Sequence, residues 1–124
     1  MSKKKGISRE QKLINALNAL PETIDDTKHR IKVKFVNDQA RSNESRFEHI
    51  SLNRHELTVN DIKRIPKQIS NSELKKDEER TKTYSIYIKR NNYNNEYIKL
   101  SVTLDFNVSN EATVKTVYIT KNIK

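Results

Sequence analysis

Residues 97–106 read YIKLSVTLDF and carry the clearest structural signal in the chain. Apolar residues occupy every second position from Ile98 to Phe106, and polar residues fill most of the positions between them. This spacing of two is typical of a β-strand that buries one face. We therefore predict a strand here and build the rest of the fold around it.

The same period continues on either side of this stretch. Residues 84–88 alternate in the same way, and residues 91–95 are rich in asparagine, which predicts a hairpin loop. Residues 107–111 predict a second turn, and residues 113–120 a last strand. In that strand we expect Val117 and Ile119 on one face, and the opposite face to carry Val114, Thr116, Tyr118 and Thr120.

The first two thirds of the chain show helical spacing at several places. Ser8 and Gln11 have the spacing of a capping box, which predicts a helix that ends at Pro21. Further helices are expected over residues 43–52 and from Thr58 onward, where Pro66 should bend or interrupt the helix. We expect a loop over residues 22–30, a strand over residues 31–35 and a charged, solvated connector over residues 71–80.

These elements predict an α+β fold, with N-terminal helices followed by an antiparallel β-meander of three to four strands. The helices would pack on one face of the sheet. We assign residues 1–42 to a basic tail, an amphipathic helix and a first strand, and residues 43–124 to the α+β domain itself.

Composition narrows the classes of function. The chain has 124 residues, with 25 Lys plus Arg against 16 Asp plus Glu and a net charge of +9, so nucleic acid is the expected partner. The absence of cysteine excludes disulfides and cysteine-ligated zinc, and we expect neither a metal nor another cofactor. No apolar run is long enough to cross a membrane, which predicts a cytoplasmic protein without membrane contact.

Candidate catalytic residues gather between residues 46 and 66, where histidine, arginine and carboxylates are concentrated. RNA cleavage without a metal needs a base, an acid and a cation at the phosphate, and histidine and arginine supply these groups. The residues that we select for catalysis here are His49, Arg54 and His55, with Arg46 for substrate binding.

The open face of the predicted sheet adds further candidates. Hydroxyls of Thr116 and Tyr118 could hold a phosphate or a sugar, and we include both among the catalytic residues. Lys89 and Lys99 are the lysines of this face that we select for substrate binding. A polar face turned to water is also the ordinary state of an antiparallel sheet.

The sequence resembles a known superfamily in the pattern His-Ile-x-x-x-Arg-His over residues 49–55, followed by Leu-Thr-x-x-Asp-Ile-x-x-Ile-Pro over residues 57–66. This pattern and the closing strand look like the phage and mobile-element nuclease-like domains of the barnase–EndoU–colicin–RelE superfamily. The resemblance implies a metal-independent endoribonuclease that acts by 2′-hydroxyl transesterification on tRNA or other cellular RNA. It also implies a toxin or effector, with an inhibitor or antitoxin protein as a second partner.

Two other functions remain open from the sequence. The chain could be a basic nucleic-acid-binding protein of a phage or plasmid without catalysis, since tyrosines on the strands can stack on bases. It could also bind a host protein through the amphipathic helix over residues 8–20.

Overall fold

The computed structural model describes residues 7–53, 56–90 and 95–121 of the chain. In chain order, the elements are α1 (Arg9–Ala19), β1 (Thr23–Asp26), β2 (Ile31–Lys34), β3 (Gln39–Arg41), β4 (Glu44–Ser45), α2 (Arg46–Asn53), α3 (Val59–Gln68), the short 3₁₀ helix η1 (Ile69–Asn71), β5 (Glu73–Lys76), β6 (Thr83–Lys89), β7 (Tyr97–Leu104) and β8 (Glu111–Thr120).

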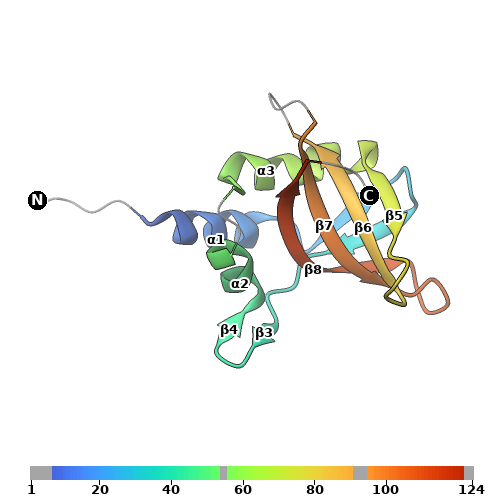
Figure 1. Ribbon diagram of the computed structural model, residues 1–124, viewed down its shortest axis with the longest axis horizontal. Coiled ribbons are helices and arrows are strands. Elements are labelled where there is room, and N and C mark those ends of the chain that lie inside the picture. The colour runs from blue at the N-terminus through green and yellow to red at the C-terminus, as the bar shows by residue number, and fades with distance from the viewer. Residues whose placement is uncertain (1–6, 54–55, 91–94, 122–124) are drawn as a thin grey trace, which may run out of the picture.

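One mixed sheet organises the molecule (Figure 1). Six strands lie in the order β1-β2-β8-β7-β6-β5, while β3 and β4 form a separate small hairpin. Neighbouring strands of the large sheet run antiparallel except β2 and β8, which run parallel through pairs such as Val33 with Ala112. Strand β8 therefore joins the N-terminal hairpin to the C-terminal meander.

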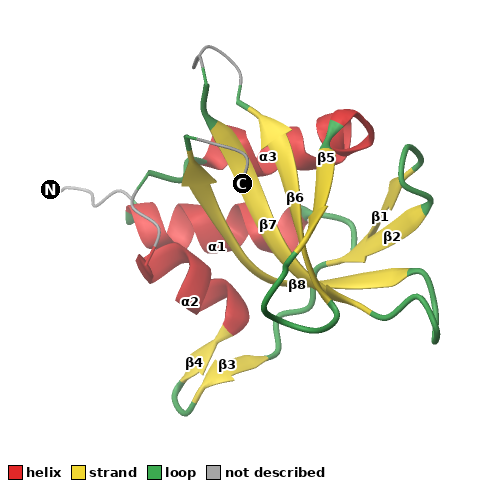
Figure 2. Cartoon of the chain, turned by 45° about the vertical axis from the view of Figure 1, so that its right-hand side comes forward, coloured by secondary structure: helices red, strands yellow, loops and turns green. Residues whose placement is uncertain are grey.

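The three α-helices lie on one side of this sheet (Figure 2) and share one hydrophobic core with it. Helix α1 contributes Leu13 and Leu17, and the alternating apolar residues of the strands face them across the core. The residues of this core that are no more than 1% exposed include Ile31, Val33, Ile50, Ile62, Ile65, Ile86, Ile98, Leu100, Val102 and Val117. Burial on this scale, at about 25 cal/mol per Å² of apolar surface, is the main force that holds the two layers together.

Helix starts follow local capping chemistry. The Ser8 side chain accepts a hydrogen bond from the Gln11 backbone, and Thr58 forms a full capping box with Asp61, as the sequence predicts. Helix α2 begins with a reciprocal pair as well, because Ser45 and Glu48 each accept a hydrogen bond from the other's backbone. Leu52, near the end of α2, is 48% exposed.

Helix α3 continues through Pro66 to Gln68, so the predicted interruption at this proline is wrong. A proline inside a helix removes one backbone hydrogen bond and costs about 3 kcal/mol. The segment stays helical because Ile62, Ile65 and Ile69 are all fully buried, and packing of this apolar face outweighs the local cost.

Two segments expected to be irregular are strands. Residues 22–30 contain β1, in which Ile24 packs into the core and the buried carboxylate of Asp26 accepts from the ring of His29 at 2.7 Å. Residues 71–80 contain β5, which forms an edge of the sheet beside β6. Each of these strands has a single apolar residue, Ile24 or Leu74, so neither shows an alternation that could identify it.

A β-bulge at Lys115 changes which side chains of β8 share a face. Ser101 pairs with Thr116, whereas the next residue, Val102, pairs with Val114, so Lys115 has no opposite partner. Val114 is therefore buried together with Val117, instead of facing out beside Thr116 as strict alternation predicts. The Lys115 carbonyl at this bulge accepts from Arg46 Nη1 at 3.2 Å.

The expected fold, helices followed by a three- or four-stranded antiparallel meander, is therefore wrong. Strands from the N-terminal third add to the meander and produce a six-stranded mixed sheet in which β2 and β8 form a parallel pair. The error has a physical origin, because β2 and β8 pair through residues about eighty positions apart, and no local pattern records such a contact.

A buried ion pair connects the helical layer to the sheet. Arg90, just after β6, donates from Nε to Asp61 Oδ1 at 2.9 Å and from Nη2 to Asp61 Oδ2 at 2.8 Å. Its third nitrogen, Nη1, donates to Glu96 Oε1 at 2.8 Å. Burial opposes the charge on Arg90, but the hydrogen bonds and charges of Asp61 and Glu96 raise its pKa above the usual value. Asp61 thus caps α3 and holds Arg90 at once.

Replacing Asp61 with alanine is expected to lower the free energy of unfolding by about 3–5 kcal/mol, because it leaves a buried guanidinium without its carboxylate. Urea unfolding followed by circular dichroism measures this change. The matched control is Asp25→Ala, since Asp25 is 66% exposed and pairs with Lys32 at the surface. That change should cost less than about 1 kcal/mol. Equal losses in the two variants would contradict a special role for the buried pair.

Candidate functional site

The sheet face opposite the helices carries a continuous set of polar side chains. Strand register aligns them in rows, because Tyr87 pairs with Lys99 and Lys99 with Tyr118, while Ser85 pairs with Ser101 and Ser101 with Thr116. Each row crosses β6, β7 and β8. A hydroxyl-rich and basic surface therefore lies on the far side of the same strands that form the core (Figure 2).

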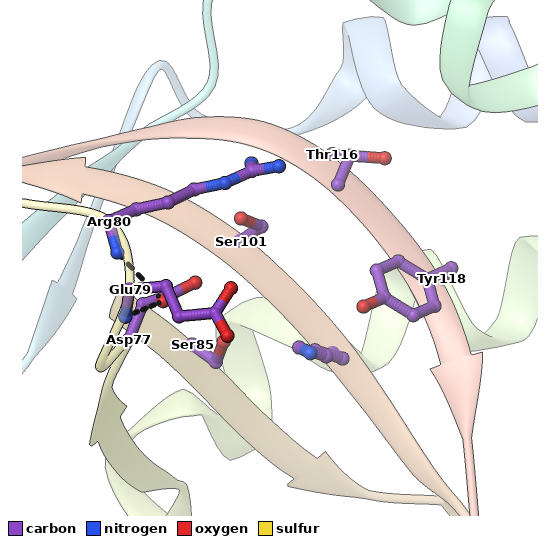
Figure 3. Close-up of a pocket in the computed structure, with 8 residues that line it drawn as sticks. Asp77, Glu79, Arg80, Ser85, Ser101, Thr116 and Tyr118 are labelled. Atoms are coloured by element: carbon purple, nitrogen blue, oxygen red, sulfur yellow. Dashed lines mark hydrogen bonds between the residues drawn. The ribbon is translucent and has the colours of Figure 1, made fainter. Parts of the chain in front are cut away.

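A hollow of about 430 Å³ lies on this face, between the strands and the turn that joins β5 to β6. Figure 3 shows its lining, in which side chains from the turn reach over those of the sheet. The residues that line it are Asp77, Glu79, Arg80, Ser85, Lys99, Ser101, Thr116 and Tyr118. All eight are polar, so the hollow suits a polar or charged group.

The turn over the hollow is built by Asp77. Its Oδ1 accepts hydrogen bonds from the backbone nitrogens of Glu79 at 2.8 Å and Arg80 at 3.0 Å. These hydrogen bonds, that from Glu79 first, lower the pKa of Asp77. Their support for the turn is thus present above the ordinary pKa of an aspartate and is lost as the pH falls through the lowered value. At neutral pH both hydrogen bonds therefore stabilise the turn.

Lys82 completes the connection to β6 in an unusual backbone conformation. Its φ of 62° lies in the left-handed region, which costs a non-glycine residue about 1 kcal/mol. The Leu104 backbone nitrogen donates to the Lys82 carbonyl at 2.9 Å, and Lys82 Nζ lies 3.1 Å from Asp105 Oδ2. The turn is thus fixed to the end of β7 and positions Glu79 and Arg80 above the sheet.

Lys99 lies at the centre of the open face. Its Nζ is 5.5 Å from the ring centre of Tyr87 and 5.3 Å from that of Tyr118, within the range of cation–π attraction. Burial opposes its charge, but hydrogen bonding and attraction to Tyr118, and more weakly to Tyr87, raise the pKa of Lys99. Lys99 is consequently a cation at neutral pH, held between two aromatic rings.

The structure brings together three of the predicted site residues, Lys99, Thr116 and Tyr118, all of which line the hollow. It also adds Ser85 and Ser101, which alternation places on the same face. The sequence analysis missed Asp77, Glu79 and Arg80. It predicted only a charged connector over residues 71–80, because the composition of such a segment does not show where its side chains lie.

The other predicted site residues lie elsewhere or serve the fold. Arg46 Nε donates to Asp38 Oδ1 at 2.9 Å, and this arginine also binds the carbonyl at the β8 bulge. His49 Nδ1 lies 2.9 Å from Glu44 Oε1, which links α2 to β4. Lys89 is exposed at the end of β6. Arg54 and His55 lie outside the described residues.

The described residues contain neither a metal-binding cluster nor a helix that could span a membrane. Over residues 7–53, 56–90 and 95–121, no group of three or more histidine or acidic side chains is placed to hold a metal ion. Over the same residues, no helix is long and apolar enough to cross a membrane.

Asp77→Ala is expected to speed amide hydrogen exchange at Glu79 and Arg80 by roughly three- to tenfold, since each loses one hydrogen bond. Asp77→Asn keeps the Oδ1 acceptor and should change these rates less than about twofold. Exchange monitored by NMR at neutral pH separates the two variants. Unchanged rates in the alanine variant would show that the turn is held by other contacts.

Residues 18–123 match the family model of the TRAPPC11 second Ig-like domain. Neither a curated protein nor a solved structure matches the chain. Immunoglobulin-like domains pack two sheets face to face. In this chain α1, α2 and α3 lie across the core from β6, β7 and β8 (Figure 2).

This match overturns the expected membership of the barnase–EndoU–colicin–RelE superfamily. The predictions that depended on it are wrong as well: an endoribonuclease, a toxin of a phage or mobile element, and RNA with an inhibitor or antitoxin as partners. The alternative of a basic nucleic-acid-binding protein of a phage or plasmid is also corrected by this match. Residues of the supposed nuclease motif serve the fold, as Asp61 does with Arg90 and His49 with Glu44. The chain belongs to the family of the TRAPPC11 second Ig-like domain.

Proposed function

We propose that this chain is a protein-binding scaffold module that docks a partner protein on the open face of β6, β7 and β8. The proposal rests on the hollow in this face, whose eight lining residues are all polar. The family supports the proposal, since a second Ig-like domain of TRAPPC11 is one of a series of such domains in a larger protein.

The distribution of buried and exposed residues favours this face over the helical side. Leu13 and Leu17 of α1 are each 1% exposed, so the apolar stripe of that helix is occupied by the core. It is not available to bind a host protein, which the sequence had left open. The open sheet face instead presents half-buried serine, threonine and tyrosine side chains beside charged ones.

The chemistry of the face suits a reversible protein contact. Tyrosines supply rigid area with a polar end, and hydroxyls and charges supply specificity through hydrogen bonds. The ring of Tyr87 packs edge-on against Tyr97 with 6.3 Å between ring centres, so this part of the face is ordered before a partner arrives. An ordered surface loses less conformational entropy on binding.

Site-specific photo-crosslinking tests the proposal. A photoreactive phenylalanine analogue is placed at Ser101 or Thr103 on the open face, and in a third variant at Lys63, which is exposed on α3. In cells that naturally produce the chain, the first two positions are expected to capture the same partner protein. The α3 position should capture no such product.

The comparison has two outcomes that would contradict the proposal. One is the same product from all three positions, and the other is no protein product from the open face. Urea unfolding of each variant, with midpoints near that of the unmodified chain, confirms that the label has not disrupted the sheet.

A further inference from the structure

We propose that the hollow is an acidic-residue seat, in which Lys99 and Arg80 hold the carboxylate of an aspartate or glutamate from the partner protein. This inference rests on the proposed function and specifies the chemistry of the contact. It is argued from the two cations of the hollow, the hydroxyls around them and the placement of Glu79.

Two cations reach the hollow from different elements. Lys99 lies on β7 and lines the hollow. Arg80 extends from the β5–β6 turn across the strands toward Thr116 (Figure 3). Within the part of the chain that the structure describes, neither residue forms an ion pair with a carboxylate. Lys34 and Lys82, in contrast, pair with Glu111 and Asp105.

The surroundings of Lys99 favour the binding of an anion. It is half-buried between aromatic rings, where the attraction of a cation for a carboxylate is stronger than in bulk water. Its pKa is raised, so it keeps its proton at neutral pH. A carboxylate from the partner would add a charge-assisted hydrogen bond that the two tyrosine rings cannot supply.

Hydroxyls complete the seat. Ser101 on β7 lines the hollow together with Thr116 and Tyr118 on β8 (Figure 3). Hydroxyl groups rotate to donate to an oxygen that arrives from outside. A carboxylate has about four lone-pair sites, which two cations and neighbouring hydroxyls can occupy together.

Glu79 and Asp77 restrict the kind of anion. Both line the hollow, and Glu79 projects into it from the turn (Figure 3). Asp77 Oδ1 accepts from two backbone amides, and the charge of this carboxylate also acts on Arg80 and Lys99. Glu79 adds a second carboxylate to the lining. Its negative charge opposes a dianionic phosphate or a polyanion more than it opposes a single carboxylate. The hollow therefore favours an acidic side chain over a nucleic acid backbone.

The test uses NMR titration of the full chain with acetyl-Gly-Gly-Glu-Gly-Gly amide, a peptide with a single carboxylate, at low ionic strength. Peptide is expected to shift the backbone amide signals of Ser85, Ser101 and Thr116. Lys99→Met should weaken this binding by about tenfold, the loss of one charge-assisted hydrogen bond. Lys63→Met removes the same charge from α3 and should change the affinity less than about twofold.

Further variants distinguish binding in the hollow from nonspecific attraction to the net charge of +9. Lys99→Arg retains the cation and is expected to bind the peptide, while Glu79→Gln should bind it two- to fivefold more tightly by removing a nearby like charge. Inorganic phosphate and a hexamer of single-stranded RNA serve as the competing anions, and we expect both to shift these amides less than the peptide does.

Several results would overturn the inference. Equal weakening by Lys99→Met and Lys63→Met would show attraction to the net charge alone, and shifts confined to other elements would place the contact elsewhere. Stronger binding of phosphate or RNA at the hollow would identify a different ligand class. Crosslinking from Ser101 that Lys99→Met leaves unchanged would reject the seat but keep the scaffold proposal, whereas failure of crosslinking itself would reject the scaffold proposal.

Discussion

The rest of the structure depends on the buried pair of Asp61 and Arg90. Both residues are no more than 6% exposed, and both oxygens of the Asp61 carboxylate accept hydrogen bonds from Arg90. The same carboxylate caps the N-terminus of α3 and binds the strand layer, so the helix cannot shift along the sheet without breaking its ion pair with Arg90. Ion pairs of this kind add little stability over an apolar replacement, but they specify one arrangement. The register between the two layers is therefore set by polar contacts, and the apolar core fills the space around them.

Local patterns in the sequence predicted the parts of this fold that are decided locally. Alternation predicted β6, β7 and β8, although the bulge at Lys115 breaks it within β8. Capping residues predicted the starts of α1 and α3. These signals depend only on residues within the element itself. The parts that were missed depend on distant residues. Strand β1 forms because Ile24 meets Val33 and the core, and α3 continues past Pro66 because of what its apolar face contacts.

The candidate site divides in the same way. Lys99, Thr116 and Tyr118 could be placed on one face because each occupies an outward position of a regular strand. Asp77, Glu79 and Arg80 could not, since the fold of their turn depends on hydrogen bonds between a side chain and the backbone. The motif from His49 to Pro66 was misleading for a third reason. Its polar residues are of the types used in nucleases, but in this fold Asp61 caps α3 and pairs with Arg90, and His49 pairs with Glu44.

The parallel pairing of β2 with β8 constrains how the chain reaches its native state. Residues 32–34 pair with residues 111–113, so the hairpin of β1 and β2 has no neighbour in the sheet until residues 111–113 have left the ribosome. Ile31 and Val33, both at most 1% exposed in the folded molecule, cannot complete their native packing before then. Closing so long a loop is slow compared with forming the C-terminal meander. Removal of β8 would thus leave the hairpin of β1 and β2 without its place in the sheet, although that hairpin is synthesised well before β8.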